Sequence, residues 1–436
     1  MTAIYFYDDV RARAFEPFAL TRPLCELRAG AMLQRERWQT ALQLPVAGFL
    51  AGAHLVDFDE AGAPRVARGG MPAGAVLVNS RFVPKLTSVV PLPNGGQSPA
   101  RSEGGVDLWL SARGGHPVAV RLTRELPADY FADGGLSIDE VARSSAETTM
   151  LEGWWLEEVW DFIRWLPEHL ADDLDFLQRS PSDQTSRRWI APPPHAVVLG
   201  THPVLLEAER PGGGDASLAA AVVEPNVILD ATAGPICIGA GSTVHAFTRL
   251  VGPCFVGRHS SVLGDRVALS AIGDVCKVRG EMSNTIVLGY ANKGHDGFVG
   301  HSYLGRWVNL GAGTITSNLK NTYGSVALWT PKGERDTGMQ FLGTLFGDHA
   351  KTGIGTCLST GTVLGTGANV YGGSMPPKVV APFSWGDARP YSVYRLDKFL
   401  EVAERVMERR HVTLSSAARL QLSAAHAARW TVERSA

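Results

Sequence analysis

The sequence predicts two domains of different fold class: an α/β domain at the N-terminus, then a left-handed parallel β-helix of hexapeptide repeats that ends in a terminal helix. The first indication is that the glycines, 48 in all, cluster between about residues 230 and 375. The second is that aliphatic–glycine pairs recur there at separations of five to seven residues or near-multiples of them. The third is that the earlier part of the chain alternates strand-like and helix-like segments without that period.

Length and composition limit the class of protein. A chain of 436 residues is too long for one ordinary core, and 45% hydrophobic with 19% charged residues is normal for globular domains. The net charge of -2 argues against a dedicated nucleic-acid binder. The five cysteines form no CxxC pair, which argues against a zinc site and a disulfide framework.

The start of the chain lacks the features of a targeting segment. It carries acidic side chains where a signal peptide has a basic and then an apolar stretch. No apolar run reaches the roughly 18–20 residues that span a bilayer. We therefore expect a soluble cytoplasmic protein with no membrane partner.

Residues 1–180 predict an α/β, Rossmann-like domain with a mainly parallel sheet. Buried strands are expected within residues 3–7 and 73–83, and apolar spacing over residues 32–42 predicts a helix packed on them. From Leu151 the sequence predicts a Trp-rich amphipathic helix, interrupted at its proline. Alternating strands and helices favour parallel pairing, because a parallel crossover usually contains a helix.

The remaining elements follow in order. Residues 181–196, rich in Ser, Pro and charge, predict a linker, and residues 197–390 predict the β-helix. In such a β-helix each coil has three short strands, and an aliphatic side chain at every sixth position fills the interior. The small residue that follows it allows the chain to turn the corner. A glycine-rich β-sandwich is the alternative, but its strands would alternate with period two. Residues 391–436 predict a helical segment with an apolar face of Val393, Leu396, Phe399, Leu400, Ala403 and Val406.

The segment from Asn284 to Tyr323 interrupts the repeat with polar residues and carries the most specific motifs. NLGAGTITSN (309–318) resembles the acetyltransferase-domain signature of the bifunctional N-acetylglucosamine-1-phosphate uridyltransferase/glucosamine-1-phosphate acetyltransferase family. Three further motifs are similar to a divergent bacterial branch of that family: LTRP (20–23), LGYANKGHDGF (288–298) and NLKN (318–321).

The resemblance covers most of the chain, but unevenly. It is strong in residues 280–323 and weaker in residues 1–190. It implies a nucleotidyltransferase-like N-terminal domain and a hexapeptide-repeat acyltransferase domain.

The resemblance implies three residues for acyl transfer. His295 stands fourteen residues before Asn309, where the family has its general base, and a neutral imidazole there would take the proton of an attacking amine. Asn309 would orient the acceptor, and the backbone N–H of Ala312 would meet the thioester carbonyl. The alternatives are an ordinary surface or core histidine and an asparagine that caps a corner of the β-helix.

The resemblance also implies acetyl-CoA as acyl donor and a small-molecule acceptor, either an amino-sugar phosphate or a nucleotide-linked amino sugar. Departures from the family at Ser283, Phe298 and Gly324 indicate a rearranged phosphate-binding set, which argues against glucosamine-1-phosphate itself. Proteins of this class form their sites between neighbouring prisms, so we expect a homotrimer. The candidate acceptor contacts are Lys293, Asn318, Lys320 and Tyr323, and Lys351 is the candidate contact for a coenzyme phosphate.

The N-terminal domain departs further from the family. Its first strand leads into a loop without glycine, although working members grip the triphosphate with a glycine-rich loop. Arg22 and Arg28 are the candidate nucleotide contacts. Asn79 and Ser80 follow the strand where the family has its magnesium carboxylate, so Mg²⁺ is expected only if the domain is active. The acidic residues that would have to substitute as ligands are Asp8, Asp9 and Glu16.

Three functions stay open at this point, and all three involve small molecules rather than nucleic acid. The preferred one is coenzyme-A-dependent N-acyl transfer to an amino sugar. The second is a sugar-1-phosphate nucleotidyltransferase whose β-helix serves oligomerisation, for which Arg22→Ala would abolish pyrophosphate release. The third is a non-catalytic scaffold that binds a nucleotide sugar, and the elaborate polar segment argues against it.

Overall fold

A computed structural model describes residues 2–88, 107–141, 147–179, 187–209, 220–387 and 390–432. The chain forms two compact units, residues 1–161 with 415–428 and residues 162–414 with 429–436. The division therefore differs from the expected boundary at residue 180, and the expected terminal segment is shared between the units. Residues 181–186 of the expected linker lie outside the described residues, and its later part contains β14 (Arg187–Ile190), which pairs with β16 (Val204–Glu209).

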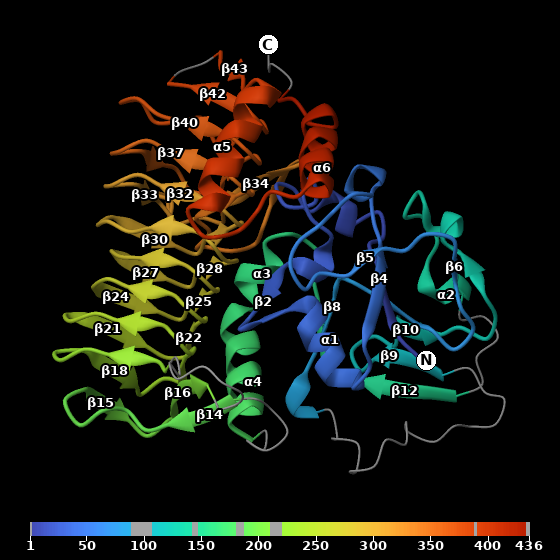
Figure 1. Ribbon diagram of the computed structural model, residues 1–436, viewed down its shortest axis with the longest axis horizontal. Helices are drawn as coiled ribbons and strands as arrows, with labels where there is room; N and C mark the ends of the chain where they lie inside the picture. The colour runs from blue at the N-terminus through green and yellow to red at the C-terminus, as the bar shows by residue number, and fades with distance from the viewer. Residues whose placement is uncertain are drawn as a thin grey trace. The chain divides into compact units, whose positions relative to one another are not determined.

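The first unit contains a seven-stranded sheet in the order β12-β9-β10-β7-β1-β4-β5 (Figure 1). β10 runs antiparallel to β7 and β9, whereas the other four neighbouring pairs are parallel. The predicted α/β class with a mainly parallel sheet is confirmed. The strands are β1 (Ile4–Tyr7), β4 (Val46–Leu50), β5 (Arg65–Val66), β7 (Val76–Asn79), β9 (Asp107–Ser111), β10 (Pro117–Arg121) and β12 (Glu147–Leu151).

The central strands β1, β7 and β10 are apolar in nearly continuous runs because side chains cover them on both faces. Trp38 of α1 (Gln34–Leu42) is fully buried against the sheet, and its indole Nε1 donates to the carbonyl oxygen of Phe82 at 2.9 Å. The smaller elements of the unit are β2 (Arg28–Ala29), β3 (Met32–Leu33), β6 (Gly70–Met71), β8 (Phe82–Pro84), β11 (Leu126–Pro127), β13 (Gly153–Trp155), α2 (Ile138–Val141) and α6 (Ser416–Ala427).

The Trp-rich segment is not one helix from Leu151, so that prediction is wrong. Trp154 and Trp155 lie in β13, which pairs antiparallel with β8, and the Trp155 ring meets the Phe82 ring edge-on at 5.4 Å. The helical part of the segment begins only at Asp161. It consists of α3 (Asp161–Arg164) and α4 (Leu166–Arg179). Pro167 is the second residue of α4, where its missing N–H removes no intrahelical hydrogen bond.

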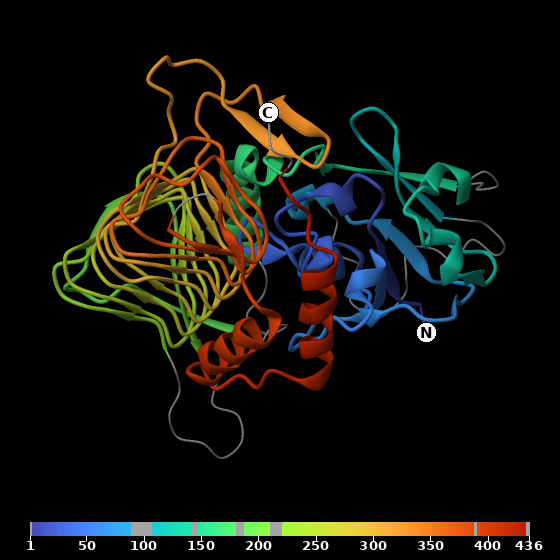
Figure 2. The same cartoon turned by 90° about the horizontal axis from the view of Figure 1, so that it is seen from above.

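The second unit is a parallel β-helix, as predicted, with three strands in each coil (Figure 2). Its first sheet contains β14, β16, β19 (Ile236–Ile238), β22 (Cys254–Val256), β25 (Ala271–Ile272), β28 (Ile286–Val287), β31 (Tyr303–Leu304), β36 (Thr344–Phe346), β39 (Thr362–Leu364) and β41 (Val379–Val380). The second contains β17 (Val222–Val223), β20 (Thr243–Val244), β23 (Ser261–Val262), β26 (Lys277–Val278), β29 (Asn292–Lys293), β32 (Asn309–Leu310), β37 (Lys351–Thr352), β40 (Asn369–Val370), β42 (Ser384–Gly386) and β43 (Ser392–Val393). The third contains β15 (Val197–Gly200), β18 (Ile228–Ala231), β21 (Thr248–Val251), β24 (Asp265–Ala268), β27 (Glu281–Ser283) and β30 (Phe298–Gly300).

The coils after β30 leave the regular pattern. β33 (Ile315–Thr316) pairs with β38 (Cys357–Leu358), and the chain makes an excursion that contains the hairpin β34 (Ala327–Thr330) and β35 (Gly333–Asp336). The excursion begins directly after the most polar motif of the sequence, so it borders the candidate site.

The aliphatic–glycine pairs have the predicted role in the prism. Ile238 and Ile272 are fully buried in its interior. A Cβ on Gly273 would lie 2.3 Å from the carbonyl oxygen of Leu288, so the next coil leaves room for glycine alone. The pair at Ile354 is an exception, because the Ile354 side chain is 79% exposed.

The terminal segment contains two helices that belong to different units. In α5 (Leu396–Glu408) Phe399 is buried, and its ring meets that of Phe383 at 4.9 Å, so this helix packs on the last coils of the prism. Val393 lies in β43 and is 53% exposed, so its place on the predicted apolar helix face is wrong. α6 belongs to the first unit, where Gln421 donates to the carbonyl oxygen of Thr21. Among the described residues, no helix is long and apolar enough to cross a membrane.

Candidate functional site

The three residues expected to carry acyl transfer lie at one corner of the β-helix on two successive coils. His295 is in the turn between β29 and β30, and Ala312 is in the corresponding turn between β32 and β33. The Gly313 N–H donates to the carbonyl oxygen of Asp296 at 3.2 Å and joins the two turns. Neighbouring coils of a parallel sheet are about 4.8 Å apart, which is within reach of one small reacting group.

Asn309 is held in the strand that leads into this corner. It is paired in register with Asn292 one coil earlier, and the Asn292 Nδ2 donates to the Asn309 Oδ1 at 2.9 Å. The Asn309 side chain stays exposed, so its amide nitrogen faces outward as a donor. The asparagine is thus both part of a side-chain ladder and available to a ligand.

The Ala312 turn presents backbone to solvent. The Thr314 N–H donates to the Gly311 carbonyl oxygen at 3.1 Å, and Gly313 has a φ of +69°, which together define a type II turn with Ala312 as its second residue. Within the described residues the Ala312 N–H has no hydrogen-bond acceptor. This donor is therefore available to an oxygen atom that develops negative charge.

His295 has an exposed imidazole with no side-chain hydrogen bond among the described residues. Its turn is fixed from inside the prism by Lys293, which occupies the inward row of the second sheet in register with Val278. The Lys293 Nζ donates to the carbonyl oxygens of Arg279 at 3.2 Å, of Asp296 at 2.8 Å and of His295 itself. Burial lowers the pKa of Lys293 to about 8.

The predicted role of Lys293 as an acceptor contact is contradicted by this placement. The side chain is only 1% exposed, and its ammonium donates to three backbone carbonyls. The sequence does not show that the Lys293 side chain belongs to the inward row. Its physical role is to hold the turn that carries the histidine.

Asn318 lies at the other end of β30 from His295 and is paired with a second histidine. Its Nδ2 is 2.9 Å from the Nδ1 of His301, whose ring stacks on Phe341 with 5.3 Å between centroids. Burial lowers the pKa of His301 to about 4, so the imidazole is neutral at pH 7. Since Nδ1 accepts from Asn318, the proton of the neutral ring lies on Nε2. His301 was not among the predicted site residues. Its position within the polar segment 284–323 could have indicated that it belongs to the site.

The remaining predicted contacts lie apart from one another. Lys320 and Tyr323 lie in the excursion, where the Lys320 Nζ donates to the carbonyl oxygen of Ser325 at 2.8 Å and the Tyr323 side chain is 68% exposed. Lys351 lies beside Asn309 in the second sheet, half-buried, with its Nζ 3.2 Å from the carbonyl oxygen of His349. Burial lowers the pKa of Lys351 to about 8.

A shallow groove, largely open to solvent, begins beside His295 and continues along the earlier coils. Its volume is about 570 Å³. At the far end Phe247 is 79% exposed, which is unusual for a phenylalanine. The groove is lined by Phe247, Arg249, Asp265, Arg266, Gly280, Glu281, Asp296 and Gly297.

The two arginines predicted to contact a nucleotide are buried in the first unit, which contradicts that prediction. Arg22 is 2% exposed and forms a two-point ion pair with Glu60, with Nη2–Oε1 and Nη1–Oε2 distances of 2.9 and 3.2 Å. Arg28 is 5% exposed and donates to the carbonyl oxygen of Ala31. Glu60 is distant in sequence, so no local pattern revealed that Arg22 is neutralised.

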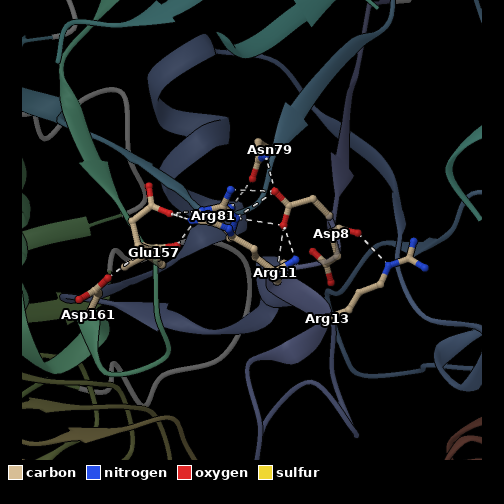
Figure 3. Close-up of polar contacts among 10 residues, drawn as sticks. Asp8, Arg11, Arg13, Asn79, Arg81, Glu157 and Asp161 are labelled. Carbon is tan, nitrogen blue, oxygen red and sulfur yellow. Dashed lines mark hydrogen bonds and ion pairs between the residues drawn. The ribbon is translucent and has the colours of Figure 1, made fainter. Parts of the chain in front are cut away.

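The carboxyl ends of β1 and β7 meet at one edge of the sheet, where α/β proteins usually bind ligands (Figure 3). Asp9 follows β1, and Arg81 follows β7. The Arg81 Nε lies 3.0 Å from both carboxylate oxygens of Asp9, and its Nη2 is 2.9 Å from Oδ2. Asn79 also donates to Asp9 Oδ2 at 3.0 Å. Arg81 was not singled out from the sequence.

Residues 4–181 match the family described as sugar nucleotidyl transferase. The matched range includes α3 and α4, which pack with the β-helical unit.

Two curated relatives support the expected resemblance at low identity. A bifunctional sugar-1-phosphate nucleotidylyltransferase/acetyltransferase of Sulfurisphaera tokodaii is 31% identical over 96 residues, 22% of this chain and 24% of that protein. The bifunctional protein GlmU of Bartonella quintana is 27% identical over 184 residues, 40% of this chain and 36% of that protein. The chain thus spans about a quarter to a third of these relatives, whose names agree with the expected transferase class.

Among solved structures, the chain is similar to a hexapeptide transferase family protein from Anaplasma phagocytophilum. The TM-score is 0.22 with 13% identity, over 52% of this chain and 98% of that one.

The described residues of the N-terminal domain offer no fitting magnesium site at the carboxyl edge of the sheet. Asp9 is occupied by Arg81 and Asn79, and the Oδ2 of the buried Asp8 accepts the Leu24 N–H at 3.0 Å. Glu16, the third expected substitute ligand, is 9% exposed. No group of three His, Cys, Asp or Glu that would hold a metal ion occurs among the described residues. The metal implied by the family therefore has no set of ligands here.

Asp8 makes the stability of this edge depend on pH. Burial raises the pKa of Asp8 from 3.8 to about 6, although the hydrogen bond from the Leu24 N–H and the charge of Arg13 oppose this shift. The folded state then binds more protons than the unfolded state between these two values. Stability is therefore gained as pH falls from about 6 toward 4, and the buried charge costs up to about 3 kcal/mol above pH 6.

We expect Asp8→Asn to be more stable than the wild type at pH 7–8 and equal to it near pH 4, since the amide carries no charge at any pH. Denaturant unfolding across this pH range measures the difference. The exposed Asp139→Asn serves as the matched control and should leave the profile unchanged. A lower stability of Asp8→Asn at pH 8 would contradict this account.

Proposed function

We propose that the β-helical unit is a coenzyme-A-dependent N-acyltransferase that acts on the amine of an amino sugar. The observation that carries the proposal is the convergence of an exposed imidazole, an exposed asparagine and an unpaired backbone N–H at one corner, from His295, Asn309 and Ala312. These groups supply a base, an orienting donor and an oxyanion donor. Acetyl-CoA is the proposed acyl donor, and the acceptor is an amino-sugar phosphate or a nucleotide-linked amino sugar.

In the proposed reaction the acceptor amine attacks the thioester carbonyl carbon, and the new C–N bond forms as the carbonyl becomes an oxyanion. His295 takes a proton from the amine nitrogen, and the Ala312 N–H donates to the oxyanion. The intermediate collapses with cleavage of the C–S bond, and the imidazolium returns the proton to the leaving thiolate. Asn309 orients the acceptor at the same corner, and Lys351 beside it is the proposed contact for a coenzyme phosphate.

The proposed set of acceptor contacts differs from the set expected from the sequence. Lys293 is removed from the set, and Asn318 acts together with His301, whose neutral ring presents an N–H donor. Lys320 and Tyr323 stay in the set as residues of the neighbouring excursion. A donor-rich set of this kind suits sugar hydroxyls and phosphate oxygens.

The proposal is tested by thiol release from acetyl-CoA with a panel of amino-sugar phosphates and nucleotide-linked amino sugars. We expect turnover in the wild type and a loss of at least about 10²-fold in His295→Ala. His202→Ala is the matched control, because His202 is exposed on the first coils, away from this corner. Equal rates in wild type and His295→Ala would refute the assignment of the base.

Sugar-1-phosphate nucleotidyl transfer is the second candidate, and the family match of residues 4–181 favours it. Pyrophosphate release from a nucleoside triphosphate in the presence of a sugar 1-phosphate is its direct readout. A ligand-binding scaffold without activity is the third candidate, which tight binding without turnover across both panels would support.

A homotrimer is part of the proposal, because the corner of one prism is convex and needs a neighbour to enclose a ligand. We expect light scattering coupled to size exclusion to give three times the chain mass of 46.7 kDa. A monomer that turns over at the wild-type rate would contradict a site shared between prisms.

A further inference from the structure

The carboxyl edge of the N-terminal sheet is closed by its own side chains. Asp9 accepts hydrogen bonds from Arg81 and Asn79 and from the backbone N–H groups of Arg11 at 3.1 Å and Ala12 at 2.9 Å. An ionised carboxylate offers about four lone-pair sites, so these donors use its whole capacity. Burial alone would raise the pKa of Asp9, yet the hydrogen bonds and charge of Arg81 lower it below its ordinary value.

Arg81 also donates to groups other than Asp9. It is 8% exposed, and its Nη1 donates to the carbonyl oxygen of Leu156 at 3.1 Å and to the Glu157 Oε2 at 3.2 Å. Its guanidinium lies over the Trp155 ring at 5.0 Å, and Glu157 is also paired with Arg11 (Figure 3). The side chain thus joins the end of β7 to the residues that follow β13.

We propose that the Arg81–Asp9 cluster closes this edge to divalent cations and to the triphosphate they carry, so that the N-terminal domain has kept the fold but not metal-dependent nucleotidyl transfer. A divalent cation needs free carboxylate oxygens, and the neighbouring Asp8 is buried with its Oδ2 accepting the Leu24 N–H at 3.0 Å. Without the cation, the charge that develops in phosphoryl transfer lacks the neutralisation that the metal supplies. The guanidinium supplies permanently the positive charge that Asp9 needs.

If the β-helical unit acylates a sugar phosphate as proposed above, the product leaves this chain without activation by a nucleotide. A separate nucleotidyltransferase must then consume the product, or act beforehand if the acceptor is already linked to a nucleotide.

The full-length chain can be titrated with Mn²⁺ and followed by electron paramagnetic resonance, with and without UTP. We expect the wild type and Asp9→Asn to give the same titration, because Asp9 binds no cation. Mn²⁺ binding in the wild type that Asp9→Asn abolishes would overturn the proposal. Mg²⁺-dependent pyrophosphate release from UTP and a sugar 1-phosphate by the wild type would overturn it as well.

The structural role of the pair is tested separately. Arg81→Ala leaves Asp9 poorly compensated, and we expect the Tm to fall by roughly 10 °C. The exposed Arg124→Ala is the matched control and should leave the Tm unchanged. If Arg81→Ala has the same Tm as the wild type, the cluster does not close this edge. If the variant is unfolded, the result agrees with a closed cluster, and the Mn²⁺ titration is the deciding test. These outcomes do not depend on acyl transfer by the β-helix.

Discussion

Replacement of Ala312 by proline should lower kcat for acyl transfer by about 10²–10³-fold, the loss typical of removing one oxyanion-hole donor. The substitution suits the backbone. Ala312 is the second residue of a type II turn whose third residue is Gly313 at φ +69°, and proline is favoured at that second position. The variant therefore removes one N–H and little else.

The control for this experiment is Ala312→Ser, which retains the N–H. It should keep the wild-type kcat within a few-fold, and both variants should keep the wild-type Tm. If Ala312→Pro folds and turns over at the wild-type rate, the Ala312 N–H is not the oxyanion donor.

Lys293→Met is expected to reduce kcat by about 10–10²-fold with a much smaller effect on stability. The ammonium holds the turn of His295 through three carbonyls, and a displacement of about 1 Å at a catalytic group costs about 10²-fold. Stability changes less, because methionine fills the same inward position and removes the cost of a buried charge. Steady-state kinetics and thermal unfolding measure the two effects.

The pH profile distinguishes this positioning role from a general loss of packing. The folded pKa of Lys293 is about 8, so deprotonation above that pH weakens the hold on the turn and should lower the wild-type rate. Lys293→Met should lack this decline. Lys277→Met, one coil earlier and exposed, is the matched control. A decline above pH 8 that persists unchanged in Lys293→Met would assign it to another group.

The β-helix could be predicted because its rule is local. An aliphatic residue and a glycine recur once on each side of a coil. The interior row requires the aliphatic residue, and the close approach of the next coil requires the glycine. The same rule fails at Ile354, whose pair looks like the others but whose side chain is exposed. It also fails to show that Lys293 belongs to the interior row, because the partners of its ammonium are backbone carbonyls that carry no sequence signal.

The N-terminal domain was harder to predict, since its decisive contacts join residues that are distant in sequence. Arg22 was predicted to be a ligand contact, but it forms an ion pair with Glu60. The role of Arg81 depends on its contacts with Asp9 and Glu157, which are distant in sequence. The Trp-rich segment has the pattern of an amphipathic helix. Trp154 and Trp155 instead complete a strand pair with β8, a tertiary contact that overrides the local pattern.

The most direct test of the central claim is detection of the amide product by mass spectrometry, after incubation of the protein with acetyl-CoA and the acceptor panel. We expect one acceptor class to gain an acetyl group on nitrogen in equimolar amount with free coenzyme A, and His295→Ala to form at least about 10²-fold less. No amide with any acceptor, or the same yield from wild type and His295→Ala, would contradict an acyltransferase site at this corner.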